Sequence, residues 1–358
     1  MGLLLMPARI SVPRRMQLFG ISSMLLPWCA PAYLALHGET DEGDTGLTIA
    51  AEVPIQWMTG FERFTKSDLE VLHVRRFNTD IALSHGFFQF GPLEPGGDPP
   101  DIVAATGSGP VGVEATVLTV PGRRGAHALF SAVRRRLGDF EPAHFIALRG
   151  HTVYVDFADA ANALPFEGRD VAAADELLTE LARFSPDPKD LVTSDHVPEQ
   201  ITVPTVGQTA RGATFWAVPF LGAAPASLLF TQFGFELGLS HCSFVSVDDI
   251  WDEIERRIKD HDKPGVDLLL ITASGPTRAG VIFPAEQAVA QLAVENVRVM
   301  RRRVEHIKEV VLHDWVSGTA WKIYPEFARL FGPLYQSLAP ASHQITDVTQ
   351  RPADDGDG

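Results

Sequence analysis

The sequence predicts an α/β fold, in which the first folded part follows the order helix, three strands, helix, strand. Three observations support this order: apolar residues at helical intervals after residue 67, two apolar runs around a glycine-rich turn, and a second amphipathic run before another apolar segment. The 358 residues suffice for one large domain or two ordinary ones. Hydrophobic residues make up 45% and charged residues 21%, which is the composition of a chain that buries a core.

The first predicted helix begins at Ser67 and ends at Gly86. Ser67 and Glu70 have the spacing of a capping box, and glycine is a common residue just after a helix. The apolar residues at helical intervals are Val74, Phe77 and Ile81. The aromatic run 87–90 follows the helix and reads as a short strand.

A β-hairpin is predicted next. The proline- and glycine-rich stretch 91–100 forms a loop before it. The strands cover residues 102–105 and 111–120, and the GSG sequence at 107–109 forms the tight turn between them.

The remaining elements are mixed, and the first two of them complete the αβββαβ order. In sequence they are a helix at 126–137, strands at 144–148 and 153–157, a helix at 171–184, a loop at 185–209, strands at 213–221 and 226–233, a helix at 247–262, a buried strand at 266–271 and a helix at 284–303.

Four parts are predicted along the chain. They are a disordered or signal-like leader (1–45), the core (46–160), a mixed α/β C-terminal part that alternatively completes the core (161–335), and a disordered acidic tail (336–358). Arg14 and Arg15 precede an apolar run, as in a secretory signal, but Pro27 interrupts that run. Residues 38–50 are polar and glycine-rich and are predicted to form a linker.

The two cysteines, Cys29 and Cys242, form no CxxC pair, which favours a reducing compartment. We therefore expect a cytoplasmic protein with no membrane partner, and the signal-like leader keeps export as the alternative. The net charge of -15 excludes a general positive field for nucleic acid, so any such partner requires a local basic groove. No Walker loop, Rossmann fingerprint or HExxH motif is present.

Two acidic residues of the hairpin form the candidate site. Asp101 lies at the start of one strand, and Glu114 lies among apolar residues of the other. A hairpin places such positions side by side, and paired carboxylates are ligands that Mg²⁺ accepts. The alternatives are that Asp101 is a turn residue and that Glu114 lies at an exposed edge, paired with an arginine.

The Pro100–Asp101 pair, followed by Glu114 and Thr116 across a hairpin, resembles the motif of the PD-(D/E)xK, or restriction-endonuclease-like, nuclease superfamily. The resemblance implies an αβββαβ core and Mg²⁺-dependent phosphodiester hydrolysis of nucleic acid. It also implies that Asp101 and Glu114 hold the metal and that Glu70 supplies the acidic residue of the first helix. Glu70 alternatively serves only the capping box, and Thr116 is alternatively an ordinary strand residue.

Thr116 stands where the superfamily has its lysine, and it cannot replace that positive charge. Either a basic residue comes from elsewhere or the chain is a non-catalytic binding protein that retains the fold. Two helices offer basic residues: Arg123, His127 and Arg134 on or before one, and Arg257, Lys259 and Lys263 on or after the other. The helix 247–262 and the strand after it also resemble the last αβ step of the superfamily, in which case 121–246 is an insertion. The oligomeric state is left open.

Overall fold

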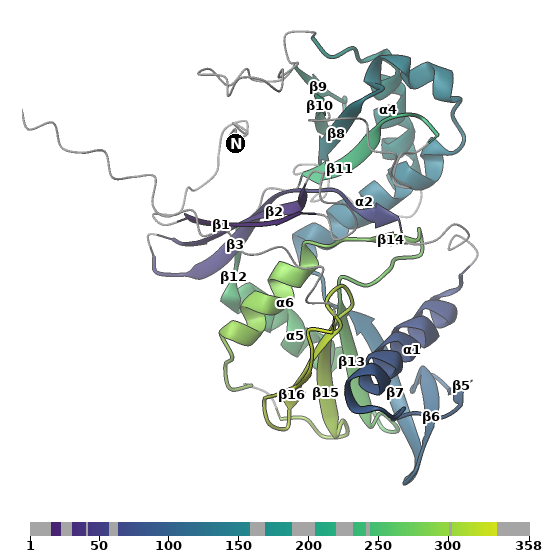
Figure 1. Ribbon diagram of the computed structural model, residues 1–358, viewed down its shortest axis with the longest axis vertical. Helices are drawn as coiled ribbons and strands as arrows, with labels where there is room; N and C mark the ends of the chain where they lie inside the picture. Colours follow the sequence, from purple (N-terminus) through teal and green to yellow (C-terminus); the bar gives the residue numbers. More distant parts are fainter. Residues whose placement is uncertain are drawn as a thin grey trace, which may run out of the picture.

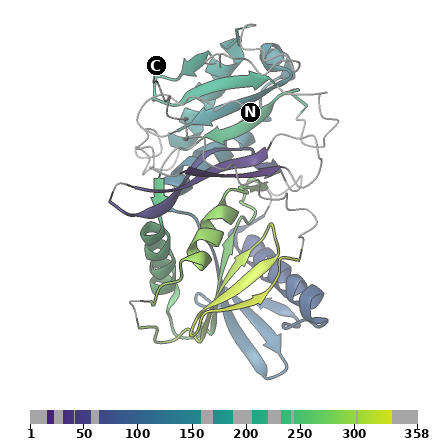
Figure 2. The ribbon, with the colours of Figure 1, turned by 60° about the vertical axis from the view of Figure 1, so that its left-hand side comes forward.

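The computed structural model describes residues 16–22, 31–40, 42–56, 64–157, 169–187, 205–219, 232–240, 244–300 and 303–334. The predicted acidic tail, the first fifteen residues of the leader and nearly all of the predicted strand 226–233 lie outside these ranges. The described elements form a mixed α/β structure in two lobes, each built on its own sheet (Figures 1 and 2).

One lobe contains a sheet with the strand order β1-β2-β3-β11-β8-β10-β9, and β12 also pairs with β3. Its strands are β1 (Met16–Ser22), β2 (Pro31–Glu39), β3 (Thr45–Glu52), β8 (His151–Asp156), β9 (Val206–Gln208), β10 (Thr214–Pro219), β11 (Glu236–Ser240) and β12 (Phe244–Ser246). Helix α2 (Pro121–Leu137), the 3₁₀ helix η2 (Pro142–Leu148) and helix α4 (Arg169–Arg183) pack against this sheet in one apolar cluster.

The other lobe contains a sheet with the order β17-β16-β15-β13-β7-β6-β5. Its strands are β5 (Leu93–Pro95), β6 (Ile102–Thr106), β7 (Gly109–Val117), β13 (Leu268–Ala273), β15 (Glu309–Asp314), β16 (Thr319–Tyr324) and β17 (Ala328–Phe331). The short strands β4 (Ile55–Gln56) and β14 (Val281–Ile282) pair separately.

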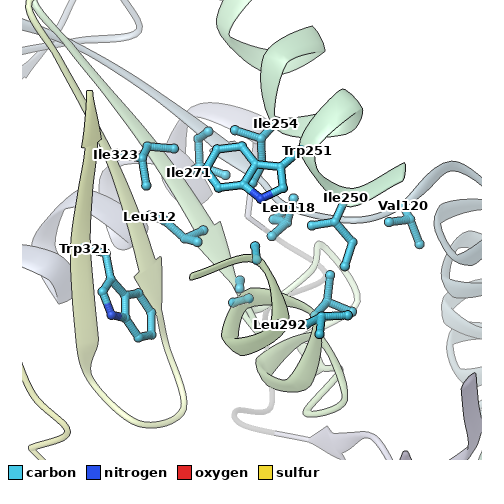
Figure 3. Close-up of a cluster of buried hydrophobic side chains, with 14 of the residues drawn as sticks. Leu118, Val120, Ile250, Trp251, Ile254, Ile271, Leu292, Leu312, Trp321 and Ile323 are labelled. Atoms are coloured by element: carbon cyan, nitrogen blue, oxygen red, sulfur yellow. The ribbon is translucent and has the colours of Figure 1, made fainter. Parts of the chain in front are cut away.

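Three helices cover the two faces of this second sheet. Helix α1 (Lys66–His85) packs on one face, whereas α5 (Val247–His261) and α6 (Glu286–Glu295) pack on the other. Trp251 and Ile254 of α5 lie against Ile271 and Leu312 of the strands, as Figure 3 shows. Side chains from β2 and β3 join the same cluster, so the two lobes share one continuous apolar contact.

The first helix agrees with its prediction, but its cap lies two residues earlier. The Thr65 side chain accepts a hydrogen bond from the Asp68 amide, and the Asp68 side chain accepts one from the Thr65 amide. These two residues therefore form the capping box that we expected from Ser67 and Glu70. Gly86 ends the helix in the left-handed conformation, with φ 81°.

The β6–β7 hairpin is confirmed, whereas two other predicted strands are wrong. Residues 87–90 are irregular, and the strand that pairs with β6 is β5, inside the predicted loop. Residues 144–148 belong to the 3₁₀ helix η2. The prediction of a strand failed there because a short apolar run fits a buried 3₁₀ helix as well as a strand. The contiguous αβββαβ order over 67–149 is therefore not formed.

The neighbour of β7 in the sheet is β13, which runs parallel to it. Helix α5 immediately precedes β13 along the chain, and residues between β7 and α5 contribute α2, η2, β8, α4 and β9–β12, mostly to the other lobe. Residues 121–246 therefore lie along the chain between β7 and the helix that leads into its neighbour, β13.

Several segments differ from the predicted domain limits. Residues 16–22 and 31–39, expected in the leader, form β1 and β2, and β3 begins inside the expected linker. The strands β15, β16 and β17 were not predicted. Within the described residues, no helix is long and apolar enough to cross a membrane.

Candidate functional site

A notch forms at the edge of the second sheet, because β7 extends beyond β6. The two strands pair from Thr106–Gly109 to Ile102–Val113, and β7 then continues for four more residues alongside β13. Asp101 precedes β6 by one residue and therefore lies opposite Glu114 in the register. The hairpin thus places the two acidic residues side by side, as predicted.

Successive residues of β7 face opposite sides of the sheet. Val113 and Ala115 pack in the cluster with α1, so Glu114 and Thr116 face α5. On that side, His261 Nδ1 lies 3.0 Å from Glu114 Oε2, and Arg257 Nη1 donates to Thr116 Oγ1 at 3.1 Å. The last two turns of α5 therefore supply two basic side chains to the notch.

The pKa values of Asp101 and Glu114 shift in opposite directions. Their side chains are 11% and 4% exposed. Burial, followed by the hydrogen bond and the charge of Glu114, raises the pKa of Asp101 to about 7. Burial alone would raise the pKa of Glu114 too, but hydrogen bonds from His261 and Asp101 lower it. Asp101 therefore holds the proton, and Glu114 stays ionised.

Glu70 joins this pair from the first turns of α1, together with a lysine that sequence reasoning did not single out. Lys66 Nζ lies 2.9 Å from Glu70 Oε1 and 3.8 Å from Asp101 Oδ1. The charge of Glu70 also contributes to the raised pKa of Asp101. The one signal in the sequence was the i,i+4 spacing of Lys66 and Glu70, which is common on helix surfaces.

A cleft of about 460 Å³ lies between α1, α2, β7, α5 and the segment after β13; Lys66, Glu70 and Thr116 line it, whereas Asp101 and Glu114 do not. Five cationic side chains line it: Lys66, Arg124, Arg135, Arg257 and Arg278. Two carboxylates, Glu70 and Glu286, line it as well. Cationic side chains thus outnumber carboxylates along the lining of the cleft.

A buried polar cluster forms the far side of the cleft. His127 Nε2 lies 3.2 Å from Glu52 Oε1, and His127 Nδ1 lies 3.2 Å from Glu286 Oε1. Arg123 also pairs with Glu52, and Thr119 Oγ1 donates to Glu286 at 2.8 Å. Burial would raise the pKa of Glu52, but Arg123, His127 and the Ala285 amide lower it to about 2. This cluster ties β3, α2 and α6 together.

The basic residues considered from the sequence fall into three groups. Arg123 and His127 pair with Glu52, and Arg134 lies near Glu236 in the first lobe, so these three do not reach Asp101. Lys259 is exposed. Arg257 contacts Thr116, and the charge of Lys263 contributes to the lowered pKa of Glu114. Of these basic residues, Arg257 of α5 and Lys263 just after α5 are therefore the ones that act on the hairpin residues Thr116 and Glu114.

Among the residues with described positions, no set of three or more histidine, cysteine, aspartate or glutamate side chains has the arrangement of a metal centre. The oxygen donors of Asp101 and Glu114 still fit Mg²⁺, which is commonly held by one or two carboxylates with water and phosphate oxygens. No family model, curated protein or solved structure matches the chain.

Proposed function

We propose that the chain is a Mg²⁺-dependent phosphodiesterase acting on nucleic acid, with the metal held by Asp101 and Glu114. The observation that carries the proposal is the position of these two carboxyl groups, which lie opposite each other in the hairpin register, beside a cleft that five cationic side chains line. Two carboxylates this close repel one another when both are ionised, and a divalent cation removes that repulsion. The neighbouring cations would then hold the phosphates of the substrate.

When bound, Mg²⁺ would polarise the phosphate and activate water. His261 would hold Glu114 ionised and oriented through its 3.0 Å contact. Lys66 and Arg257 would stabilise the charge that develops on the phosphate, since both line the cleft beside the carboxyl pair. Glu70 would position Lys66 through their ion pair.

Arg257 is a candidate to replace the lysine that the superfamily motif has and this chain lacks. Its guanidinium donates to the Thr116 hydroxyl, so a positive charge lies next to the strand position where the superfamily has lysine. Lys66 brings a second positive charge to within 3.8 Å of Asp101. Both observations favour the hypothesis that a basic residue from elsewhere replaces the lysine.

One observation favours the second candidate function, a non-catalytic binding protein with the same fold. Arg257 Nε also donates to Glu253 at 2.8 Å, and Lys66 pairs with Glu70, so each cation is partly neutralised within the protein. A chain that binds nucleic acid without cleaving it would tolerate this neutralisation.

Cleavage assays with Glu114→Gln test the proposal. Labelled DNA and RNA are incubated with the purified chain and Mg²⁺ or Mn²⁺. We expect Glu114→Gln to reduce cleavage by about 10²–10³-fold, because it removes one charge that holds the metal and barely changes the shape. Glu94→Gln, on the exposed face of β5, is the matched control and should cleave normally.

Metal binding is measured independently of cleavage, by calorimetry with Mn²⁺ and by thermal unfolding. Binding should strengthen as pH rises through about 7, because the proton on Asp101 must leave before the metal binds. A metal at 100 times its Kd should stabilise the fold by about 2.7 kcal/mol. Cleavage that survives both Asp101→Asn and Glu114→Gln would refute the proposed site, and nucleic-acid binding without cleavage would support the second candidate.

A further inference from the structure

Two of the five cations in the cleft lack a carboxylate partner among the described residues. Lys66 pairs with Glu70, and both Arg124 and Arg257 pair with Glu253. Arg135 and Arg278, in contrast, are exposed and form no described ion pair. They come from α2 and from the segment after β13, so the two lobes each contribute one unpaired charge.

Hydroxyl groups accompany these arginines. Ser131 lies one helical turn before Arg135 on α2, and both line the cleft. Thr277 lies next to Arg278, and its buried Oγ1 has no hydrogen-bond partner in the described part of the chain. A buried hydroxyl without a partner is costly, and a phosphate oxygen would accept a hydrogen bond from it. Guanidinium and hydroxyl groups together are typical contacts to phosphates and sugars.

The size of the cleft limits the substrate. A volume of about 460 Å³ lies in the range of sites for small ligands, about 300–1,000 Å³. Asp101 and Glu114 are recessed, with 11% and 4% of their side chains exposed, and the cleft beside them is walled by α1 and α2. This confinement favours a flexible single strand over an intact duplex.

We propose that the cleft binds single-stranded nucleic acid, with Arg135 and Arg278 holding the phosphates next to the scissile one. The proposal rests on the proposed function for the position of the scissile phosphate. The binding of the strand does not depend on the metal, so it is measured separately from cleavage.

The test is fluorescence polarisation with labelled 12-mer single strands of DNA and RNA in EDTA. Arg135→Ala and Arg278→Ala should each weaken binding and each lower the salt slope by about 0.7, the value for one phosphate contact to a single strand. Arg75→Ala is the matched control, because Arg75 is exposed on α1 and does not line the cleft. Thermal unfolding of each variant confirms that it is folded.

The outcomes separate the two proposals. A duplex of the same sequence that binds as tightly as the strand would overturn the single-strand proposal. Three other results would also overturn it. They are a mononucleotide that competes as effectively as the strand, an Arg75→Ala variant whose binding is weakened as much as that of the cleft variants, and no binding of the strand at all. Binding that depends on Arg135 and Arg278, without cleavage in Mg²⁺, would support the single-strand proposal while refuting the phosphodiesterase.

Discussion

At the scale of single residues, the pair formed by Asp101 and Glu114 determines how the site responds to pH. The pKa of Asp101 is raised from its usual 3.8 to about 7, so the folded protein binds a proton that the unfolded chain releases. The stabilisation from this proton is complete below pH 3.8 and is lost as pH rises through about 7. Without a cation, the site therefore destabilises the fold at alkaline pH.

The substitution Asp101→Asn should remove this destabilisation of the fold at alkaline pH. The amide cannot ionise, and its oxygen still accepts the hydrogen bond that the Ala115 amide donates to Asp101. At pH 8 in EDTA we expect a gain on the order of 1 kcal/mol, or about 1–2 °C in Tm, by calorimetry. At pH 4 the gain should vanish. The control is Asp98→Asn, at an exposed position nearby, which should change Tm at neither pH. A loss of stability by Asp101→Asn at pH 8 would contradict the raised pKa of Asp101.

At the scale of elements, the sequence predicted local structure better than contacts between distant segments. The hairpin was predictable, because the GSG turn and the strands around it lie within sixteen residues of each other. The placement of Arg257 and His261 against β7 was not, because 141 and 147 residues separate these contacts. The segment 144–148 was misread because its four apolar residues, 145–148, are too few to carry a period that distinguishes a strand from a helix.

The cluster around Glu52 holds three elements of the two lobes and should control their stability in acid. The pKa of Glu52 is lowered from its usual 4.5 to about 2, so its stabilising contribution is complete above pH 4.5 and is lost as pH falls towards 2. Glu52→Gln leaves Arg123 buried without a counter-charge. We expect a loss of about 3–5 kcal/mol in urea unfolding at pH 7.

The matched control for this prediction is Glu39→Gln, at an exposed position on β2. It should change the free energy of unfolding by less than about 0.5 kcal/mol. The variant Glu52→Gln should also lose less stability than the unmodified chain between pH 4.5 and 2, since the titrating group is gone. An equal loss in both proteins would assign the acid sensitivity to another group.

At the scale of the whole molecule, the candidate site depends on parts of the chain that are far apart. Asp101 and Glu114 lie on the β6–β7 hairpin, whereas His261 and Arg257 lie on α5, and the sheet continues through β13. The predicted core of residues 46–160 includes only the first of these parts. It lacks the parallel partner of β7 and the helices that cover one face of the sheet.

A fragment of residues 46–160 should therefore fail to fold. Its β7 would expose the edge that β13 covers and the apolar face that α5 and α6 cover. Circular dichroism and limited proteolysis should show an unfolded, rapidly degraded chain. The matched comparison is residues 16–334, which should give a cooperative unfolding transition. A stable 46–160 fragment would show that the hairpin and α1 suffice for a core.

The parallel pairing of β7 with β13 also sets the order of events during synthesis. The contact of the Gly112 amide with the Asp267 side chain joins positions 155 residues apart. At about 5–20 residues per second, a ribosome exposes β7 for roughly 8–30 seconds before its partner exists. During that interval, the chain between them can form most of the other lobe, while the edge of β7 that β13 later covers stays unpaired.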